Sequence, residues 1–142
     1  MKVSEIMSRQ VIGISPDETV EVAARQLSHY NIGALPVCDS EGKVCGLVTD
    51  RDLVTRCLAA NRSPAQTKVR EIMTNQVISV KPDMQTADAA QLMGMRQVRR
   101  LPVTQDGKIC GMLSLGDLAS AEECTEEATN ALSDITHNIS TR

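Results

Sequence analysis

The chain has almost no aromatic residues: its 142 residues include one Tyr and neither Phe nor Trp. Its core must therefore be aliphatic, and the aromatic platforms on which single-stranded nucleic acids stack are missing. Positive charge is also scarce, because 15 Lys and Arg against 18 Asp and Glu leave a net charge of -3. Proteins that bind DNA concentrate Lys and Arg, so we expect no DNA partner.

Long hydrophobic stretches are absent as well. No apolar run approaches the roughly 18 residues needed to cross a bilayer, and Met1-Lys2 leads into a polar segment without a signal-like core. We therefore predict a cytoplasmic protein with no membrane partner. With 42% hydrophobic and 23% charged residues, and only 8 Gly and 5 Pro, the composition is typical of a globular protein.

The five cysteines form no Cys-x-x-Cys pair, and only two histidines, His29 and His137, accompany them. This spacing does not match that of zinc sites, so we predict no metal. Cys45 and Cys110 lie in apolar segments, which suits small buried side chains in a reducing compartment. Neither histidine lies in a nucleophile motif, and we predict no catalytic residue.

The chain does contain an internal repeat. Residues 66 positions apart match through the first part of each copy, where Glu5-Ile6-Met7 meets Glu71-Ile72-Met73. After a one-residue deletion, Cys45-Gly46 meets Cys110-Gly111. Each copy is close to the ~60-residue size at which burial is marginal, so the copies should pack together and any site should occur twice. We predict a first repeat at 1–60, a linker at 61–68, a second repeat at 69–120, and a C-terminal amphipathic helix and tail at 121–142.

Both copies predict the same order of elements, strand, helix, strand, strand, helix, in an α/β (α+β) fold. A short helical segment (3–8 and 69–74) precedes each first strand (11–14 and 77–80). Thr19 is a suitable N-cap for the first long helix, 19–30, and we expect Thr86 to cap its counterpart. A hairpin follows, with 34–38 paired to 43–48, and the last helix begins near Asp50 or Leu115. Gly94, inside a helix, indicates close packing there.

Apolar residues recur at steps of three and four between Ala121 and Ile139, which predicts an amphipathic helix with an acidic outer face. Two roles stay open for this helix. It can pack back on its own domain, or it can join an interface between subunits.

Each copy carries a hydroxyl residue at the end of a strand and an Asp three positions later: Thr49 with Asp52, and Ser114 with Asp117. One interpretation is a capping box, which only satisfies free N–H groups. The other is functional, because a helix N-terminus favours phosphate, a hydroxyl can donate to it, and a carboxylate can accept from ribose hydroxyls. The pattern alone leaves both interpretations open.

Two adjacent arginines, Arg99 and Arg100, precede a buried strand. Alternation along a strand directs at most one of them toward a given site, where it could pair with phosphate. Otherwise the two form a solvated strand edge or ion pairs. The first copy has Gly33 and Ala34 instead, small enough for a flat ring to approach the backbone. We therefore expect two similar sites of unequal affinity.

These motifs resemble cystathionine β-synthase (CBS) domains: Ile-Met near each start, Leu-Pro-Val in the middle, and Gly-Leu-Val-Thr-Asp-Arg-Asp-Leu at 46–53. From about Val3 to Leu118 the chain is similar to a stand-alone CBS pair, or Bateman module. The resemblance implies a three-stranded sheet and two helices per copy, pseudo-two-fold symmetry with packing through the sheets, and two clefts between the copies. It also implies a homodimer formed through the helices.

The clefts of such modules often bind adenosine derivatives. By position, the resemblance assigns ribose to Asp52 and Asp117, and the phosphate side to Thr49, Ser114 and Arg99 or Arg100. The base and the cleft lining are assigned to Ile12, Gly33, Ala34, Leu35, Ile78, Val98 and Leu101. The basic pair ranks AMP, ADP and ATP above S-adenosylmethionine, NAD and cyclic dinucleotides, as a regulatory ligand and not a cofactor.

The leading hypothesis is a non-catalytic sensor in which an adenine nucleotide changes the packing of the repeats and so biases an unknown partner protein or the dimer. The alternative is a protein-interaction or dimerisation module with vestigial clefts. An enzyme ranks third.

Overall fold

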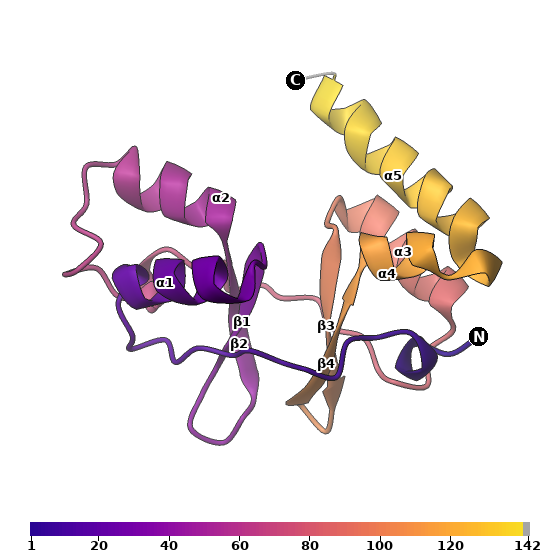
Figure 1. The fold of residues 1–142 in the computed structure, drawn as a ribbon, viewed down its shortest axis with the longest axis horizontal. Helices are drawn as coiled ribbons and strands as arrows, with labels where there is room; N and C mark the ends of the chain where they lie inside the picture. The colour runs from indigo at the N-terminus through magenta and orange to yellow at the C-terminus, as the bar shows by residue number, and fades with distance from the viewer. Residues whose placement is uncertain (141–142) are drawn as a thin grey trace. The chain divides into compact units, whose positions relative to one another are not determined.

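A computed structural model describes residues 1–140 of the chain, with side chains for residues 1–137. The fold is mixed α+β, with two separate two-stranded antiparallel sheets and helices around each (Figure 1). These residues form two compact units. Unit 1 contains Met1–Val11 and the described residues from Ile78 onward, and unit 2 contains Ile12–Val77.

Unit 2 carries one hairpin and its helices. Its elements are α1 (Val20–Tyr30), β1 (Ala34–Cys38), β2 (Val44–Thr49), α2 (Asp50–Asp52), the π-helical η2 (Leu53–Leu58) and the 3-10 turn η3 (Val69–Glu71). The expected cap is confirmed, because the Thr19 hydroxyl accepts from the Val22 N–H at 3.2 Å. α1 buries Val20, Ala23 and Leu27 at helical spacing, and these meet the fully buried Leu35 and Val48 of the hairpin in one aliphatic core.

Unit 1 has the same plan with one extra helix. Its elements are the 3-10 turn η1 (Val3–Glu5), α3 (Thr86–Arg96), β3 (Arg100–Gln105), β4 (Lys108–Ser114), α4 (Leu115–Ser120), the 3-10 turn η4 (Glu122–Cys124) and α5 (Thr125–Ser140). Asp106 and Gly107 connect β3 to β4 with φ of 55° and 80°. Two successive positive φ values match the twist of a tight hairpin, which is why Asp-Gly is found there.

The strands expected at 11–14 and 77–80 are reduced to single parallel bridges. Ile14 is bridged to Val37, and Val80 to Val103. Both backbone groups of Ile14 bond to the hairpin, at 3.0 and 2.9 Å. Residues 11–13 make no bridge to the hairpin, and Pro16, which has no N–H to donate, stops the ladder on the other side of Ile14. Each sheet therefore has two full strands and not three.

The expected cap at Thr86 is wrong. Gln85 is the N-cap residue of α3, it makes no side-chain cap hydrogen bond, and Thr86 is the first helical residue. The repeats are 66 residues apart here, so the position equivalent to Thr19 is Gln85. Thr86 is buried instead, and its hydroxyl oxygen lies 3.4 Å from the Sγ of Cys124, which donates to it.

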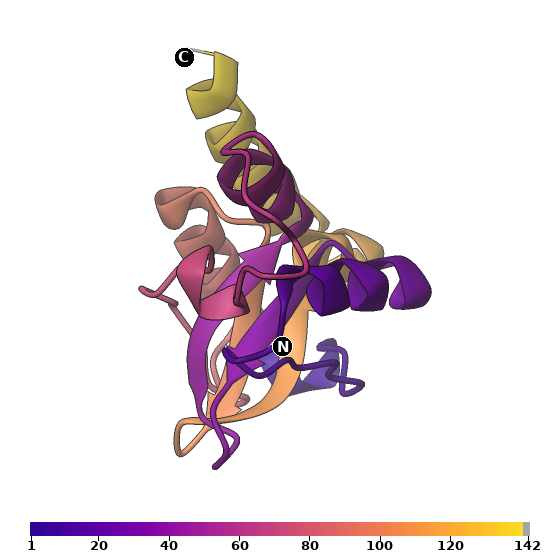
Figure 2. The same cartoon turned by 90° about the vertical axis from the view of Figure 1, so that its left-hand side faces the viewer.

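The C-terminal helix packs back on its own domain. α5 lies against α3 and α4 in both views (Figures 1 and 2). It begins at Thr125, later than the sequence pattern predicts, because α4 ends at Ser120 and Ala121 is extended at φ -89° and ψ 115°. Ala128, Ala131 and Ile135 are buried, whereas the side chain of Ile139 lies outside the described residues.

The close packing expected at Gly94 is confirmed. A Cβ on this residue of α3 would lie 2.7 Å from Oδ2 of Asp134 on α5. The small residue therefore lets the two helices approach each other closely.

Each unit contains one short segment that packs on its hairpin, residues 3–8 in unit 1 and residues 69–74 in unit 2, and we call them the first and second methionine segments. Each packs on the hairpin of the other sequence repeat. In unit 1, Ser8 and Met112 exchange both backbone hydrogen bonds, at 2.8 and 2.9 Å. In unit 2, Thr74 and Leu47 do the same, at 2.9 and 3.0 Å. Each compact unit is therefore built from parts of both repeats.

One glycine in each hairpin admits this packing. A Cβ on Gly111 would lie 2.5 Å from Sδ of Met7 and 3.0 Å from the Ser8 carbonyl oxygen. A Cβ on Gly46 would lie 2.5 Å from Sδ of Met73 and 3.1 Å from the carbonyl oxygen of the next residue. The repeated Ile-Met and Cys-Gly motifs of the sequence thus meet crosswise.

We expect Gly46→Ala and Gly111→Ala each to lower the free energy of unfolding by about 1–3 kcal/mol, because the added methyl overlaps a sulfur and crowds a hydrogen-bonded carbonyl. Urea denaturation measures the change. Gly13→Ala is the control, because the nearest atoms to its Cβ are 3.6 Å away, and its effect should stay within about 0.5 kcal/mol. Equal losses in all three variants would contradict the crosswise packing.

Candidate functional site

Thr49 and Asp52 form a complete capping box at the start of α2. The Thr49 Oγ1 accepts from the Asp52 N–H at 3.1 Å, and Oδ2 of Asp52 accepts from the Thr49 N–H at 3.0 Å. The second carboxylate oxygen, Oδ1, lies 3.7 Å from Nε of Arg56. This arrangement positions both side chains at the end of β2.

Ser114 and Asp117 repeat the box at the start of α4, with distances of 3.0 and 2.8 Å. The position equivalent to Arg56 is Ala121, and the part of the chain with placed side chains shows no ion pair to Asp117. The two carboxylates therefore differ in surroundings although their capping bonds match.

The capping interpretation describes the geometry correctly, and it leaves the functional one open. Each cap uses the hydroxyl oxygen as an acceptor, so the O–H hydrogen of Thr49 or Ser114 can still be donated to a phosphate oxygen. Each cap also uses only one carboxylate oxygen, so Oδ1 of Asp117 can still accept from a sugar hydroxyl, whereas Oδ1 of Asp52 lies beside Arg56.

Both arginines of the second repeat line one pocket, which overturns the expectation that at most one points toward a given site. The reason is that β3 begins at Arg100, so Arg99 precedes the strand and the alternation does not apply to it. Both arginines line the pocket together with the first residues of α4. Neither guanidinium takes part in an ion pair with residues 1–137. Two unneutralised guanidinium groups make this an electropositive site.

The pocket has a volume of about 560 Å³ and lies entirely in unit 1. One side comes from the β3 and β4–α4 region, with Arg99, Arg100, Ser114, Leu115, Gly116 and Ala119. The other side comes from α5, with Thr125, Ala128, Thr129 and Leu132. A volume of several hundred Å³ is typical of small-molecule sites.

The remaining predicted site residues divide between the two units. Unit 2 holds Ile12, Gly33, Ala34 and Leu35, and unit 1 holds Ile78, Val98 and Leu101. Ala34 pairs with Thr49 across the hairpin, as Arg100 pairs with Ser114. The side chains of Leu35 and Leu101 are 0% and 1% exposed in their own cores. Only their backbone can face a ligand.

Sequence reasoning missed the α5 side of the pocket. Thr125, Ala128, Thr129 and Leu132 share one helix face at spacings of three and four. Two of them, Ala128 and Leu132, belong to the apolar pattern that predicts the helix, but the pattern cannot tell which surface the helix covers.

The CBS domain family model matches the chain twice, over residues 3–59 and 69–123. The chain belongs to the CBS domain family. The CBS domain-containing protein YhcV of Bacillus subtilis (strain 168) is 39% identical over 135 residues, which is 95% of each chain. CBS pairs are regulatory modules, and some bind adenosine derivatives.

Solved structures of CBS proteins share the fold. The CBS domain pair of protein MJ0100, in complex with 5′-methylthioadenosine and S-adenosyl-L-methionine, has a TM-score of 0.76 at 28% identity and covers 84% of this chain and 93% of its own. The hexameric CBS-CP12 protein from bloom-forming cyanobacteria has a TM-score of 0.79 at 28% identity, with coverage of 89% and 73%.

The residues with placed side chains include no group of three or more His, Cys, Asp and Glu that could hold a metal ion. Burial, then Cys45 and Asp39, raise the pKa of the Cys38 thiol above its ordinary range, and burial likewise raises the pKa of Cys45. Both thiols are therefore poor nucleophiles at neutral pH. Along the described chain, every helix falls short of the length and apolar character that a membrane span needs.

Ser114→Ala should lower the free energy of unfolding of this CBS pair by about 0.5–2 kcal/mol, because the Asp117 N–H loses its capping acceptor. Ser114→Asp should retain most of the stability, because Asp is an equally good N-cap. Chemical denaturation tests both, with the exposed Ser120→Ala of α4 as the control within about 0.5 kcal/mol. A Ser114→Ala effect no larger than this control would contradict the capping role.

Proposed function

We propose that this CBS pair is a non-catalytic sensor that binds an adenine nucleotide, AMP, ADP or ATP, and passes a change in packing to its dimer or to a partner protein. The observation that carries the proposal is the pocket that joins Arg99, Arg100 and Ser114 in unit 1. Two guanidinium groups and a hydroxyl with a free hydrogen suit an anion of several oxygens.

Asp117 supplies the complementary group. Its Oδ2 is held by the Ser114 N–H at 2.8 Å, which fixes the carboxylate next to the pocket. Its Oδ1 can accept from a ribose hydroxyl, because a carboxylate offers acceptors only. A ligand that carries both a phosphate and a ribose matches this pair of features, whereas a bare phosphate uses only the arginines.

The arginines favour nucleotides over S-adenosylmethionine, although MJ0100 binds that ligand. S-adenosylmethionine has a cationic sulfonium and no phosphate, so two guanidinium groups near its binding site would repel the sulfonium. NAD and cyclic dinucleotides contain phosphate but are larger, and they rank after the mononucleotides.

The two repeats should bind with different affinities. In unit 2 the positions of Arg99 and Arg100 are occupied by Gly33 and Ala34, and Oδ1 of Asp52 faces Arg56 at 3.7 Å. A phosphate at Thr49 would therefore meet less positive charge, and the carboxylate there is already engaged. Sensing further requires that the nucleotide bind two arrangements of the protein unequally.

Arg100→Ala should weaken ATP binding by about 10- to 100-fold, the effect of losing a hydrogen bond to a charged group. Asp117→Ala should weaken it more than Asp52→Ala does, because the second repeat is the stronger site. Isothermal titration calorimetry with AMP, ADP and ATP measures the affinities. Arg96→Ala, on the exposed end of α3, is the matched control and should change affinity less than about twofold.

Ser114→Asp separates the two roles of the capping residue in the same titration. It keeps the cap but places a carboxylate beside Arg99 and Arg100, so it should abolish ATP binding without unfolding the protein. Wild-type protein that binds none of the three nucleotides at millimolar concentration would contradict the proposed function.

We further propose that the CBS pair forms a homodimer through the helices of unit 2. Val54 and Leu58 of η2 are 56% and 57% exposed, and Tyr30 at the end of α1 is 43% exposed. The equivalent of α1 in unit 1 is α3, which α5 covers at Ala90 and Gly94. A second copy of the chain would cover the exposed Val54, Leu58 and Tyr30 of unit 2.

Val54→Asp combined with Leu58→Asp should convert a particle of about twice 15.4 kDa into a monomer in size-exclusion chromatography with light scattering. The double change places two charges in a buried apolar interface, where neither has a partner. Met95→Asp on α3 is the control, because Met95 is 69% exposed and outside this face. A wild-type monomer, or a dimer that tolerates the double variant, would contradict the interface.

The alternative is an interaction module with vestigial clefts. Its support is that both capping boxes are complete without any ligand, so structure alone can account for Thr49, Asp52, Ser114 and Asp117. Nucleotide affinity that is insensitive to both Asp52→Ala and Asp117→Ala would favour this function.

A further inference from the structure

The α5 wall of the pocket is not part of the repeated CBS pattern. The family match ends at residue 123, and α5 begins at Thr125. Thr125, Ala128, Thr129 and Leu132 nevertheless face the same pocket as Arg99 and Arg100. Unit 2 has no such helix after η2, because the chain continues from Leu58 into the polar stretch before η3. The second repeat thus has a wall that the first repeat lacks.

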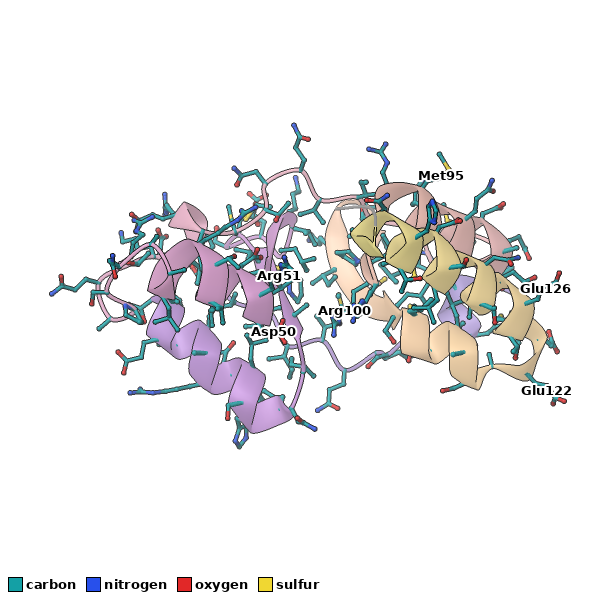
Figure 3. The ribbon with its side chains drawn as sticks, turned by 90° about the horizontal axis from the view of Figure 1, so that it is seen from above. Asp50, Arg51, Met95, Arg100, Glu122 and Glu126 are labelled. Atoms are coloured by element: carbon teal, nitrogen blue, oxygen red, sulfur yellow. The ribbon has the colours of Figure 1, made fainter. Side chains whose placement is uncertain are left out.

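The charged and neutral side chains of η4 and α5 lie on different faces. The helix and the turn before it carry five carboxylates, Glu122, Glu123, Glu126, Glu127 and Asp134. None of these lines the Arg99–Arg100 pocket, to which α5 contributes only neutral side chains. Figure 3 shows Glu122 and Glu126 projecting from the end of η4–α5 that lies away from Arg100. The guanidinium groups therefore meet no competing carboxylate within the pocket.

The hydroxyl groups on this face present acceptors. The Thr129 Oγ1 donates to the Thr125 carbonyl at 2.8 Å, and the Thr125 Oγ1 donates to the Glu122 carbonyl at 3.2 Å. Their hydrogens are used within η4 and α5, so the oxygen lone pairs can receive a ribose hydroxyl or an amino group. Ala128 and the 45% exposed Leu132 add apolar surface. The wall suits the nucleoside part of a nucleotide whose phosphate pairs with the arginines.

We propose that α5 completes the nucleotide pocket of the second CBS repeat, and that a bound adenine nucleotide holds α5 against β3 and α4 of the same unit. This inference rests on the proposed function and names the element that would report occupancy of its site. Binding and docking of α5 then stabilise each other, because coupling between two equilibria is reciprocal.

Two matched threonines test the wall. Thr129 and Thr136 are both exposed residues of α5, and each donates its hydroxyl to the carbonyl four residues earlier at 2.8 Å. Only Thr129 lines the pocket. Calorimetry with ATP as the probe compares Thr129→Glu and Thr129→Lys with Thr136→Glu and Thr136→Lys at one ionic strength. Circular dichroism checks that all four variants keep the wild-type helix content.

The affinity should follow the sign of the charge at position 129. Thr129→Glu should weaken ATP binding about tenfold or more, and Thr129→Lys should tighten it several-fold, since an unneutralised charge in the pocket acts on the phosphates. The two Thr136 variants should stay within about twofold, because their charge lies outside the pocket. Adenosine, which has no phosphate, should respond less than ATP to either charge.

Hydrogen exchange gives a second readout. ATP should slow the exchange of the amides of 125–132 in the wild type, and it should not do so in Arg100→Ala at the same ATP concentration. Equal effects at positions 129 and 136, or unchanged exchange in α5 while Arg100→Ala still weakens ATP, would overturn the role of α5 and leave the proposed function standing. No binding of ATP to the wild type would overturn both.

Discussion

The fold depends on the contact between each methionine segment and a hairpin glycine. Met7 lies on Gly111 and Met73 lies on Gly46, so closely that a single methyl group on either glycine would overlap the sulfur. Val3 and Val69, from the same segments, are fully buried in the two cores. Neither sequence repeat therefore completes a core from its own residues, and each unit needs a segment of the other repeat.

The packing of each methionine segment on the hairpin of the other repeat holds in place the two hairpins that carry the candidate site. β2 and β4 each pair with a methionine segment at one place and end in a capping box at another. The strand thus carries the hydroxyl and carboxylate to a defined position in each repeat. The repeats differ beyond that shared frame. Arginines replace Gly33 and Ala34, and α5 adds a neutral wall, only in the second repeat.

Much of the fold and of the candidate site can be predicted from the sequence. The helical spacing of Val20, Ala23 and Leu27 predicts α1, and Asp-Gly predicts the second hairpin turn, because both patterns follow from local geometry. The expected three-stranded sheets are wrong because the first strand of each repeat makes only one bridge to its hairpin. The expectation that at most one of the two arginines points toward a given site is wrong because Arg99 precedes the strand. Both errors come from element boundaries, which depend on hydrogen bonds that residues far along the chain supply.

By itself the sequence determined the family, the two repeats, their helices and hairpins, and the Thr49–Asp52 and Ser114–Asp117 pairs. These features are local, or they repeat at a fixed spacing, so residue order is enough to identify them. Only the tertiary structure decided that the methionine segments cross between repeats, that both arginines share one pocket, and that α5 lines it. An amphipathic pattern predicts that a helix will bury one face. Which surface it covers depends on the shape and charge of partners that are distant in the sequence.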